Sequence, residues 1–372
     1  MTERATTRGT QRTSLDGTRA DVLICGASFA GLAVARELAG SGADVLLVDR
    51  YAIGERATSA CAAPTPWLHA LGVEDAIRQE LPDMTFTTPY GTVRYRLPWS
   101  WSAFDYRELC RLLFAQSDAR FTTAKVHGRG PGGVDTDRGV LRAPAVVDAL
   151  GWRRVLGTPR YQPPQAPLSR GLEVHPRAGA PDDALDIWIE RALVPRGYGW
   201  RVPAAGEQRV GVGSYAPRDH VRQPTVGLAR RLDVDAVHYQ GNWFPHRLRP
   251  ATEAGVFFVG DSAGHCFPLS GEGIRTALYF GVACGRELRA VQAGHQPLER
   301  ALARYHEFSA GHRRAFTRAL HLQQLLPMIP PRLLTLGLRA FGAQRVVDRA
   351  FGWYLRQADP AFAGGRRPSS AP

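Results

Sequence analysis

The amino-acid sequence predicts an α/β fold with three parts: a parallel sheet covered by helices, an inserted and mostly antiparallel β-sheet, and a C-terminal helical region. Three observations predict it. An apolar strand at the start of the chain runs into a glycine turn and a helix. A second strand, loop and helix follow far along the chain. Between them, short segments alternate apolar and polar residues, as half-buried strands do.

The first segment has the pattern of a dinucleotide-binding βαβ unit. It contains a strand at 21–25, a glycine turn at 26–31, a helix to about residue 39 and a second strand at 45–48 that ends in Asp49. Gly26 and Gly31 suit a tight turn below a pyrophosphate, and Asp49 is the expected acceptor for a ribose hydroxyl. Ser28 stands where a glycine is usual, and its side chain could crowd a phosphate. An ordinary glycine-rich turn is the alternative interpretation, which Asp49 and the strand context make less favoured.

The second segment follows a strand at 255–259 and places an acidic residue at a strand end and two glycines at a helix start. Asp261 can accept hydrogen bonds from ribityl or ribose hydroxyls, and the positive end of the next helix can hold an anion such as a reduced flavin. The cofactor-binding residues expected here are Gly260, Asp261, Pro268, Gly271, Gly273 and Ile274. His265 lies in this loop and is either a proton donor, an orienting group or a packed side chain.

Three further patches extend the pattern. Residues 104–109 contain Arg107 at an expected helix start, and residues 146–151 contain Asp148 after a strand. Residues 194–203 read VPRGYGWRVP and are followed by RVGVG at 209–213. With both segments above, these patches resemble the FAD-dependent oxidoreductases of the para-hydroxybenzoate hydroxylase fold, and within them the geranylgeranyl reductase family. The resemblance runs from about residue 21 to residue 285. Asp148 stands where the family usually has Ala-Asp-Gly, and Val202 where Phe is usual.

The resemblance implies a discontinuous domain organisation. A Rossmann-type FAD-binding domain is expected at 21–61, 104–156 and 255–292, a substrate domain at 62–103 and 157–254, and a helical region at 293–360. Within the substrate domain, strands are expected at 85–87, 92–96, 185–189 and 209–213. Residues 1–20 and 361–372 have the composition of disordered ends. Arg107 is expected to contact the flavin side of the site.

Four residues are candidates for the substrate site. Tyr198 and Trp200 lie two apart on an expected strand, so both point to one face and suit the wall of an apolar pocket. A purely structural aromatic core is the alternative. Cys61 precedes small residues, as in the reductases, although a lone cysteine is more often a buried small hydrophobe. His265 completes the set.

The function that this resemblance implies is FAD-dependent reduction of carbon–carbon double bonds in an isoprenoid or similar apolar substrate. The alternative is an FAD-dependent monooxygenase acting on an apolar or aromatic substrate. Halogenation is less favoured, because the only lysine, Lys125, stands too far along the chain to match the halogenase lysine. A non-enzymatic basic module is the third class. The electron donor stays open among NAD(P)H, ferredoxin and another reductase.

Composition limits the partners. The formal charge of +13 comes almost wholly from dispersed arginines with no recognised module, which argues against a nucleic-acid partner. Five cysteines without Cys-x-x-Cys spacing, and no His-Glu-x-x-His, predict neither disulfides nor a metal site. A polar start and the lack of a long apolar run predict a cytoplasmic protein. The apolar and basic segment around 325–338 could contact a membrane surface peripherally, although a helical layer packed on the protein itself is favoured.

Overall fold

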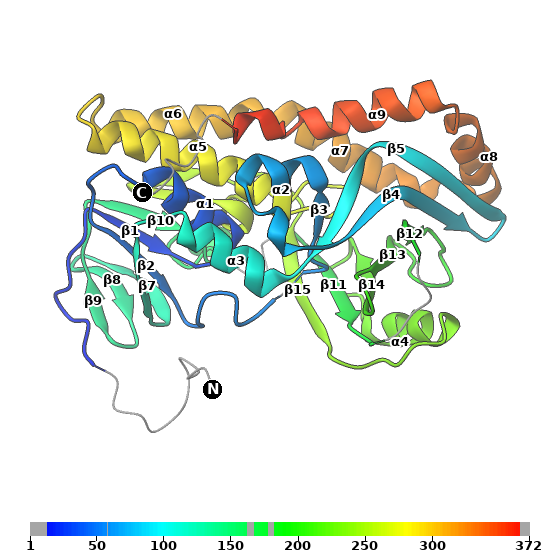
Figure 1. Cartoon of the computed structure of the whole chain (residues 1–372), viewed down its shortest axis with the longest axis horizontal. Helices are drawn as coiled ribbons and strands as arrows, with labels where there is room; N and C mark the ends of the chain where they lie inside the picture. Colours follow the sequence, from blue (N-terminus) through cyan, green and yellow to red (C-terminus); the bar gives the residue numbers. More distant parts are fainter. Residues whose placement is uncertain (1–12, 58, 162–166, 178–181, 365–372) are drawn as a thin grey trace.

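The computed structural model describes residues 13–57, 59–161, 167–177 and 182–364. Two large sheets lie side by side, and a layer of C-terminal helices runs along both of them (Figure 1). This arrangement confirms the expected α/β fold with an inserted sheet and a helical C-terminal region.

The first sheet has six strands in the order β16-β17-β10-β1-β2-β6, and only β16 is antiparallel to its neighbour. Its strands are β1 (Val22–Cys25), β2 (Val45–Asp49), β6 (Arg120–Thr123), β10 (Ala145–Asp148), β16 (Thr252–Glu253) and β17 (Val256–Phe258). The strand β1 is buried along its whole length, which explains its uninterrupted apolar sequence. Cys25 pairs with Val48 and Asp148 across the parallel ladders. The turns after these strands therefore meet at one edge of the sheet.

Two helices beside this sheet approach each other unusually closely. They are α1 (Phe29–Leu38), which links β1 to β2, and α5 (Ile274–Gln292), which follows β17. A Cβ added at Gly281 of α5 would lie 2.7 Å from the Cβ of Ala33 and 2.8 Å from the carbonyl oxygen of Ala30. A glycine is therefore required at position 281 for the two helix backbones to pack at this distance.

The second sheet has eight strands in the order β15-β11-β14-β13-β12-β4-β5-β3, antiparallel except between β12 and β4. They are β3 (Ala62–Pro64), β4 (Ile77–Thr88), β5 (Gly91–Phe104), β11 (Leu168–Val174), β12 (Ala184–Trp188), β13 (Gly197–Pro203), β14 (Gln208–Ser214) and β15 (Gln240–Pro245). The four predicted strands of this region are confirmed in β4, β5, β12 and β14, although β12 ends one residue earlier than expected, at Trp188. A small third sheet contains β7 (Val126–Gly130), β8 (Gly133–Thr136) and β9 (Gly139–Leu141).

The remaining helices complete the layers. They are α2 (Thr65–Leu71), α3 (Tyr106–Ala115), α4 (Arg222–Arg231), α6 (Leu298–Gly311), α7 (Arg313–Leu325), α8 (Pro331–Phe341) and α9 (Gln344–Arg356), with the 3-10 turns η1 (Glu74–Ala76), η2 (Pro159–Tyr161), η3 (Gly260–Ala263), η4 (Leu326–Met328) and η5 (Pro360–Phe362). The proline at 327 and those at 330 and 331 separate α7 from α8, as the loss of backbone donors requires.

Part of each terminal segment expected to be disordered is folded against the protein. Residues 13–20 lie along β9, where Leu15 N–H donates to the Arg138 carbonyl at 2.7 Å and Arg19 forms a parallel bridge with Arg142. At the other end, the Phe362 ring packs on Tyr279 with centroids 4.7 Å apart. Residues 1–12 and 365–372 lie outside the described residues.

Candidate functional site

The dinucleotide turn lies between β1 and α1 and is shaped by its two glycines. Gly26 has φ +111°, and a Cβ there would overlap the carbonyl of Ala149. A Cβ at Gly31 would overlap the carbonyl of Gly26. Ser28 is the N-cap of α1 and makes no side-chain cap; its hydroxyl instead accepts a hydrogen bond from Tyr106 at 3.1 Å. The two glycines are therefore needed for close packing of the backbone, while Ser28 lines a cavity.

Asp49 braces this turn from the end of β2. Its Oδ2 accepts from the N–H of Ala27 at 2.8 Å, and its Oδ1 accepts from the N–H of Tyr51 at 3.1 Å. Burial raises the pKa of Asp49, and these backbone donors partly oppose the shift. The residue also lines the cavity, and its role as a ribose acceptor stays a prediction.

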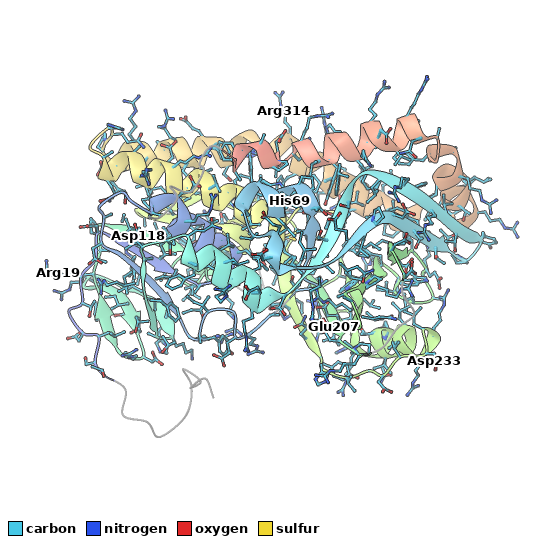
Figure 2. All side chains as sticks on the ribbon, viewed as in Figure 1. Arg19, His69, Asp118, Glu207, Asp233 and Arg314 are labelled. Carbon is cyan, nitrogen blue, oxygen red and sulfur yellow. The ribbon has the colours of Figure 1, made fainter. Side chains whose placement is uncertain are left out.

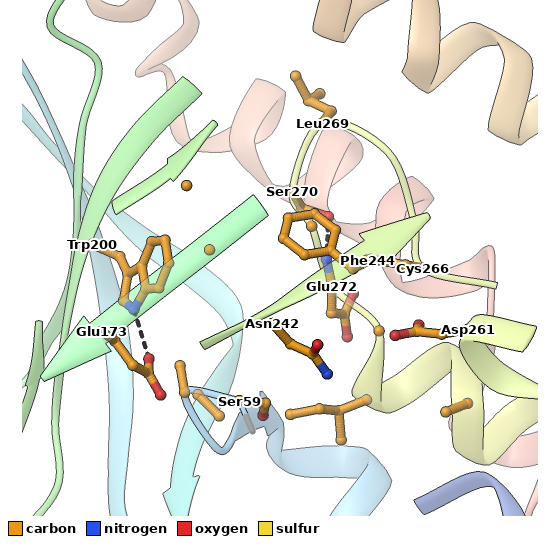
Figure 3. Close-up of a pocket in the computed structure, with 18 of the residues that line it drawn as sticks. Ser59, Glu173, Trp200, Asn242, Phe244, Asp261, Cys266, Leu269, Ser270 and Glu272 are labelled. Atoms are coloured by element: carbon orange, nitrogen blue, oxygen red, sulfur yellow. Dashed lines mark hydrogen bonds between the residues drawn. The ribbon is translucent and has the colours of Figure 1, made fainter. Parts of the chain in front are cut away.

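Asp261 follows β17 in the turn η3 and presents a carboxylate to the same cavity (Figure 3). Within the described residues this carboxylate has no hydrogen-bond partner, and burial raises its pKa to about 6 although Arg249 opposes the shift. An acceptor left open in a cavity wall is suited to hydroxyl groups of a ligand.

The start of α5 opens onto the cavity beside Asp261. Its N-cap, Gly273, provides no side-chain hydrogen bond, and residues 271–274 all line the cavity. The first N–H groups of a helix have no partner within the helix, and they carry the positive end of its dipole. This part of the wall can therefore hold an anion.

The loop before α5 is held in place by three tyrosines of other elements. The hydroxyl of Tyr198 on β13 donates to the Ser270 carbonyl, and that of Tyr215 donates to the Leu269 carbonyl at 2.6 Å. Tyr354 of α9 donates to the Ser270 hydroxyl at 3.0 Å. Because Leu269 has φ +73°, the loop is strained, and these contacts keep its shape.

Beyond this loop the cavity becomes apolar. Its total volume is about 1090 Å³, and it runs from the dinucleotide turn to a chamber between the second sheet and the C-terminal helices. Tyr198, Trp200 and Val202 all line it, so the predicted common face of these three residues is confirmed. The helices contribute a second wall, which includes Leu326, Leu334, Leu338, Phe341 and Phe351.

Trp200 owes its position to the strands beside it. It pairs with Gly211 on β14, where a Cβ would overlap the indole ring, and the ring also lies over Gly213. The glycines of the RVGVG segment thus leave room for a tryptophan. Its Nε1 donates to Glu173 Oε2 at 3.1 Å (Figure 3).

Glu173 is a site residue that the sequence analysis missed. It lies on β11, is 3% exposed, and lines the cavity. His175 Nε2 lies 2.9 Å from its Oε1, and Gln240 also donates to that oxygen. The signal was present in the strand LEVH, whose alternation places Glu173 and His175 on one face. Only the packing shows that this face meets the cavity.

Other expected site residues lie outside the cavity lining. His265 is fully buried, its ring stacks on Phe280 at 3.6 Å, and its Nδ1 accepts from the N–H of Gly260 at 3.2 Å. Burial lowers the pKa of His265 well below its ordinary value, so the ring is neutral. It therefore shapes the turn before Asp261, and this position does not suit a proton donor to substrate.

Cys61 and Arg107 also lie outside the cavity lining. Burial raises the pKa of the Cys61 thiol to about 12, and its Sγ donates to the Ser59 carbonyl at 3.1 Å, while its neighbours Ala60 and Ala62 face the cavity. Arg107 is exposed, packs near Gly54 and does not line the cavity, whereas the preceding Tyr106 does.

Two further residues have structural roles. Pro268 belongs to the loop before α5 but does not line the cavity. Asp148, whose role the sequence left open, accepts from the N–H groups of Leu150 at 3.0 Å and Leu156 at 2.8 Å. Its carboxylate thus holds the turn after β10. No group of His, Cys, Asp and Glu residues in the described part of the chain could hold a metal ion.

Comparisons with known proteins agree with this geometry. No family model matches the chain. It is 30% identical to the chloroplastic geranylgeranyl diphosphate reductase of Oryza sativa subsp. japonica over 130 residues, a match that covers 32% of this chain and only 28% of the rice protein.

Two solved structures share most of the architecture. A geranylgeranyl bacteriochlorophyll reductase-like protein of Thermoplasma acidophilum superposes with a TM-score of 0.79 at 18% identity, covering 93% of this chain and 98% of that one. A probable FAD-dependent monooxygenase of Pseudomonas aeruginosa, PqsL, gives 0.64 at 18% identity, covering 83% and 97%. These matches establish the fold, and the resemblance noted in the sequence is confirmed.

Proposed function

We propose that the chain is an FAD-dependent oxidoreductase that reduces carbon–carbon double bonds of an isoprenoid or similarly apolar substrate. The observation that carries the proposal is one continuous cavity, which joins a dinucleotide turn to an apolar chamber. At about 1090 Å³ it exceeds the roughly 300–1,000 Å³ usual for one small ligand, so it has room for a cofactor and a substrate together.

The residues present fit FAD. Gly26 and Gly31 allow the close backbone packing that shapes the turn, and Ala27, Ser28 and Ala30 of the turn line the cavity. Asp49 suits the adenosine ribose, and the open carboxylate of Asp261 suits the ribityl hydroxyls. The start of α5 would stabilise negative charge on the isoalloxazine ring. An absorption spectrum of the purified protein tests this assignment directly, because bound oxidised flavin is yellow.

FAD, once reduced by an external electron donor, would supply the hydride, and the second carbon of the double bond would take up a proton. The protein would supply binding, orientation and exclusion of water. Trp200, Val202 and the leucines of α7 and α8 form the apolar wall that would hold a prenyl chain. Product mass after incubation with geranylgeranyl diphosphate and a reductant tests the reaction. A mass gain of two hydrogens, whether or not O₂ is present in the assay, supports reduction. An unchanged substrate in the presence of reduced flavoprotein argues against it.

The second candidate is a monooxygenase, which the structural likeness to PqsL favours. A gain of one oxygen atom in the same experiment would establish it. A halogenase is less favoured, since Lys125 lies next to Ala124, whose N–H donates to the Asp49 carbonyl at 2.7 Å. That position belongs to the dinucleotide end of the cavity and not to the apolar chamber.

A lipid surface would be a suitable source of such a substrate. Every helix in the described ranges is too short or too polar to cross a bilayer. However, Leu322 and Leu333 are 49% and 58% exposed and also line the cavity, so the apolar chamber reaches this surface. Exposed arginines occur on the same helices: Arg332 directly precedes Leu333 in α8, and Arg314 projects from the start of α7 (Figure 2). We therefore propose peripheral contact of α7 and α8 with anionic lipid.

A further inference from the structure

A second cavity, which we term the arginine pocket, opens beside the first. Its volume is about 420 Å³, and four of its lining residues are Arg50, Arg56, Arg153 and Arg170. The first two follow β2, the third follows β10 and the last lies on β11, so the fold gathers them from three separate parts of the chain. Most of its lining also belongs to the main cavity, and the two are therefore continuous.

These four arginines differ from the buried arginines of the molecule. Arg154 and Arg275 have carboxylate partners at 3.0 and 2.8 Å, whereas no carboxylate in the described ranges lies within ion-pair distance of the four pocket arginines. Grouped like charges repel one another, and each exposed guanidinium normally gains from an acidic neighbour. An arrangement that leaves four of them around one cavity favours an anionic ligand.

Aromatic rings hold the guanidinium groups in place. Arg153 lies over the Trp152 ring at 5.1 Å, and Arg170 lies over the Trp243 ring at 5.0 Å. The two indoles are 6.4 Å apart. Asn242 Oδ1 fixes the Trp152 indole by accepting from its Nε1 at 2.7 Å, and it also accepts from the backbone N–H of Trp243 at 3.0 Å. Cation–π contacts of this kind keep the positive charges oriented without neutralising them.

The position of the pocket connects it to the site. Asn242 lines both cavities and lies between Asp261 and Glu173 in Figure 3. A ligand anchored among the arginines would therefore extend toward the place proposed for the flavin. Bidentate guanidinium groups and flat indole faces together suit a diphosphate group that carries an aromatic or apolar substituent.

We propose that the arginine pocket binds the diphosphate of a second ligand, which meets the cofactor in the shared cavity. Two ligand classes carry this chemistry, a nicotinamide dinucleotide and a prenyl diphosphate. The inference deepens the proposed function, because the first would be the electron donor and the second the substrate.

Calorimetric titration of the purified protein, with and without added FAD, tests the proposal. Inorganic pyrophosphate should bind in both cases, and more weakly as salt is raised. Arg170→Gln is the decisive variant, since Arg170 lines only the arginine pocket, and we expect it to weaken binding about tenfold to a hundredfold. Arg314→Gln, at an exposed arginine on α7, should change nothing.

The remaining probes distinguish the two ligand classes. They also distinguish failure of the arginine-pocket proposal from failure of the FAD assignment. Tighter binding of NADP⁺ than of pyrophosphate indicates the dinucleotide, and tighter binding of geranylgeranyl diphosphate than of geranylgeraniol indicates the prenyl substrate. Equal affinities of the Arg170 and Arg314 variants, no pyrophosphate binding, or displacement of pyrophosphate by FAD would each overturn the proposal. A colourless protein that still binds pyrophosphate would overturn the FAD assignment alone.

Discussion

Asp261 is a carboxylate whose burial opposes its charge. Its folded-state pKa of about 6 lies above the ordinary 3.8, so without cofactor the folded state binds the proton more tightly than the unfolded state. The free energy of unfolding is therefore unaffected below about pH 3.8, falls as the pH rises, and reaches its full reduction above about pH 6. This reduction amounts to at most about 3 kcal/mol.

We therefore expect opposite effects of Asp261→Asn on stability and on cofactor retention. At about pH 7.5 the variant without FAD should melt at a higher temperature than the parent, and this difference should shrink as pH falls toward about 4. FAD binding should weaken by roughly 1–3 kcal/mol, because a carboxylate acceptor is lost. Scanning calorimetry and the flavin-to-protein ratio measure the two effects. Asp233→Asn, at an exposed position (Figure 2), is the control; unchanged FAD occupancy in Asp261→Asn would remove Asp261 from the cofactor site.

Trp200 forms part of the apolar wall, and its removal should separate catalysis from cofactor binding. Trp200→Ala should cost about 2–4 kcal/mol of stability, less than the loss of a fully buried tryptophan in a well-packed core. The flavin spectrum should persist while re-oxidation of reduced flavin by substrate slows. Trp200→Phe keeps an aromatic wall but loses the bond to Glu173, so an intermediate rate is expected. Loss of FAD in either variant would favour a purely structural role.

At the scale of elements, the contact between α1 and α5 links stability to the cofactor turn. Gly281→Ala places a methyl group against Ala33 and the backbone of Ala30, and neither can move without shifting α1. Overpacking of this kind should cost about 1–3 kcal/mol, and it should also reduce FAD retention because α1 starts at the turn.

The matched control is Gly227→Ala in α4, where a new Cβ meets nothing within 4 Å. There the better helix propensity of alanine should raise the free energy of unfolding by roughly 0.5–1 kcal/mol. Urea denaturation of both variants measures the comparison. Equal stability changes would show that the helix contact tolerates a methyl group.

At the scale of the whole molecule, one face combines exposed apolar residues with arginine. Met328 and Leu336 are 73% and 58% exposed on η4 and α8, yet neither lines the cavity. The double variant Met328→Ser, Leu336→Ser should therefore keep the flavin site while losing affinity for vesicles that contain phosphatidylserine, by several-fold or more.

Co-sedimentation with such vesicles measures this prediction. Replacing Val237 and Tyr239 by serine is the control, since both are exposed apolar residues on another part of the surface, before β15. The membrane proposal fails if the two double variants bind vesicles equally, or if neutral vesicles bind the parent as well as anionic ones.

Much of the fold follows from local sequence. The strands that contain residues 22–25, 45–49 and 209–213 and the helix after Ser28 were predicted because burial and backbone period are local properties. The same holds for the residue types at special backbone positions. Gly26 and Gly271 have positive φ, Asp49 is the last residue of β2, and Asp261 follows β17. The roles of these residue types could therefore be predicted from the sequence.

What the sequence by itself determined is therefore the parallel sheet, its glycine turns and the two acidic residues beside them. Only the tertiary structure decided which neighbouring side chain faces the cavity: Tyr106 and not Arg107, Ala60 and Ala62 and not Cys61, Asp261 and not His265. It also decided that Glu173, the C-terminal helices and the four pocket arginines meet the site. The physical reason is that facing a cavity depends on elements remote in sequence, whose packing fixes the direction in which each side chain finds space.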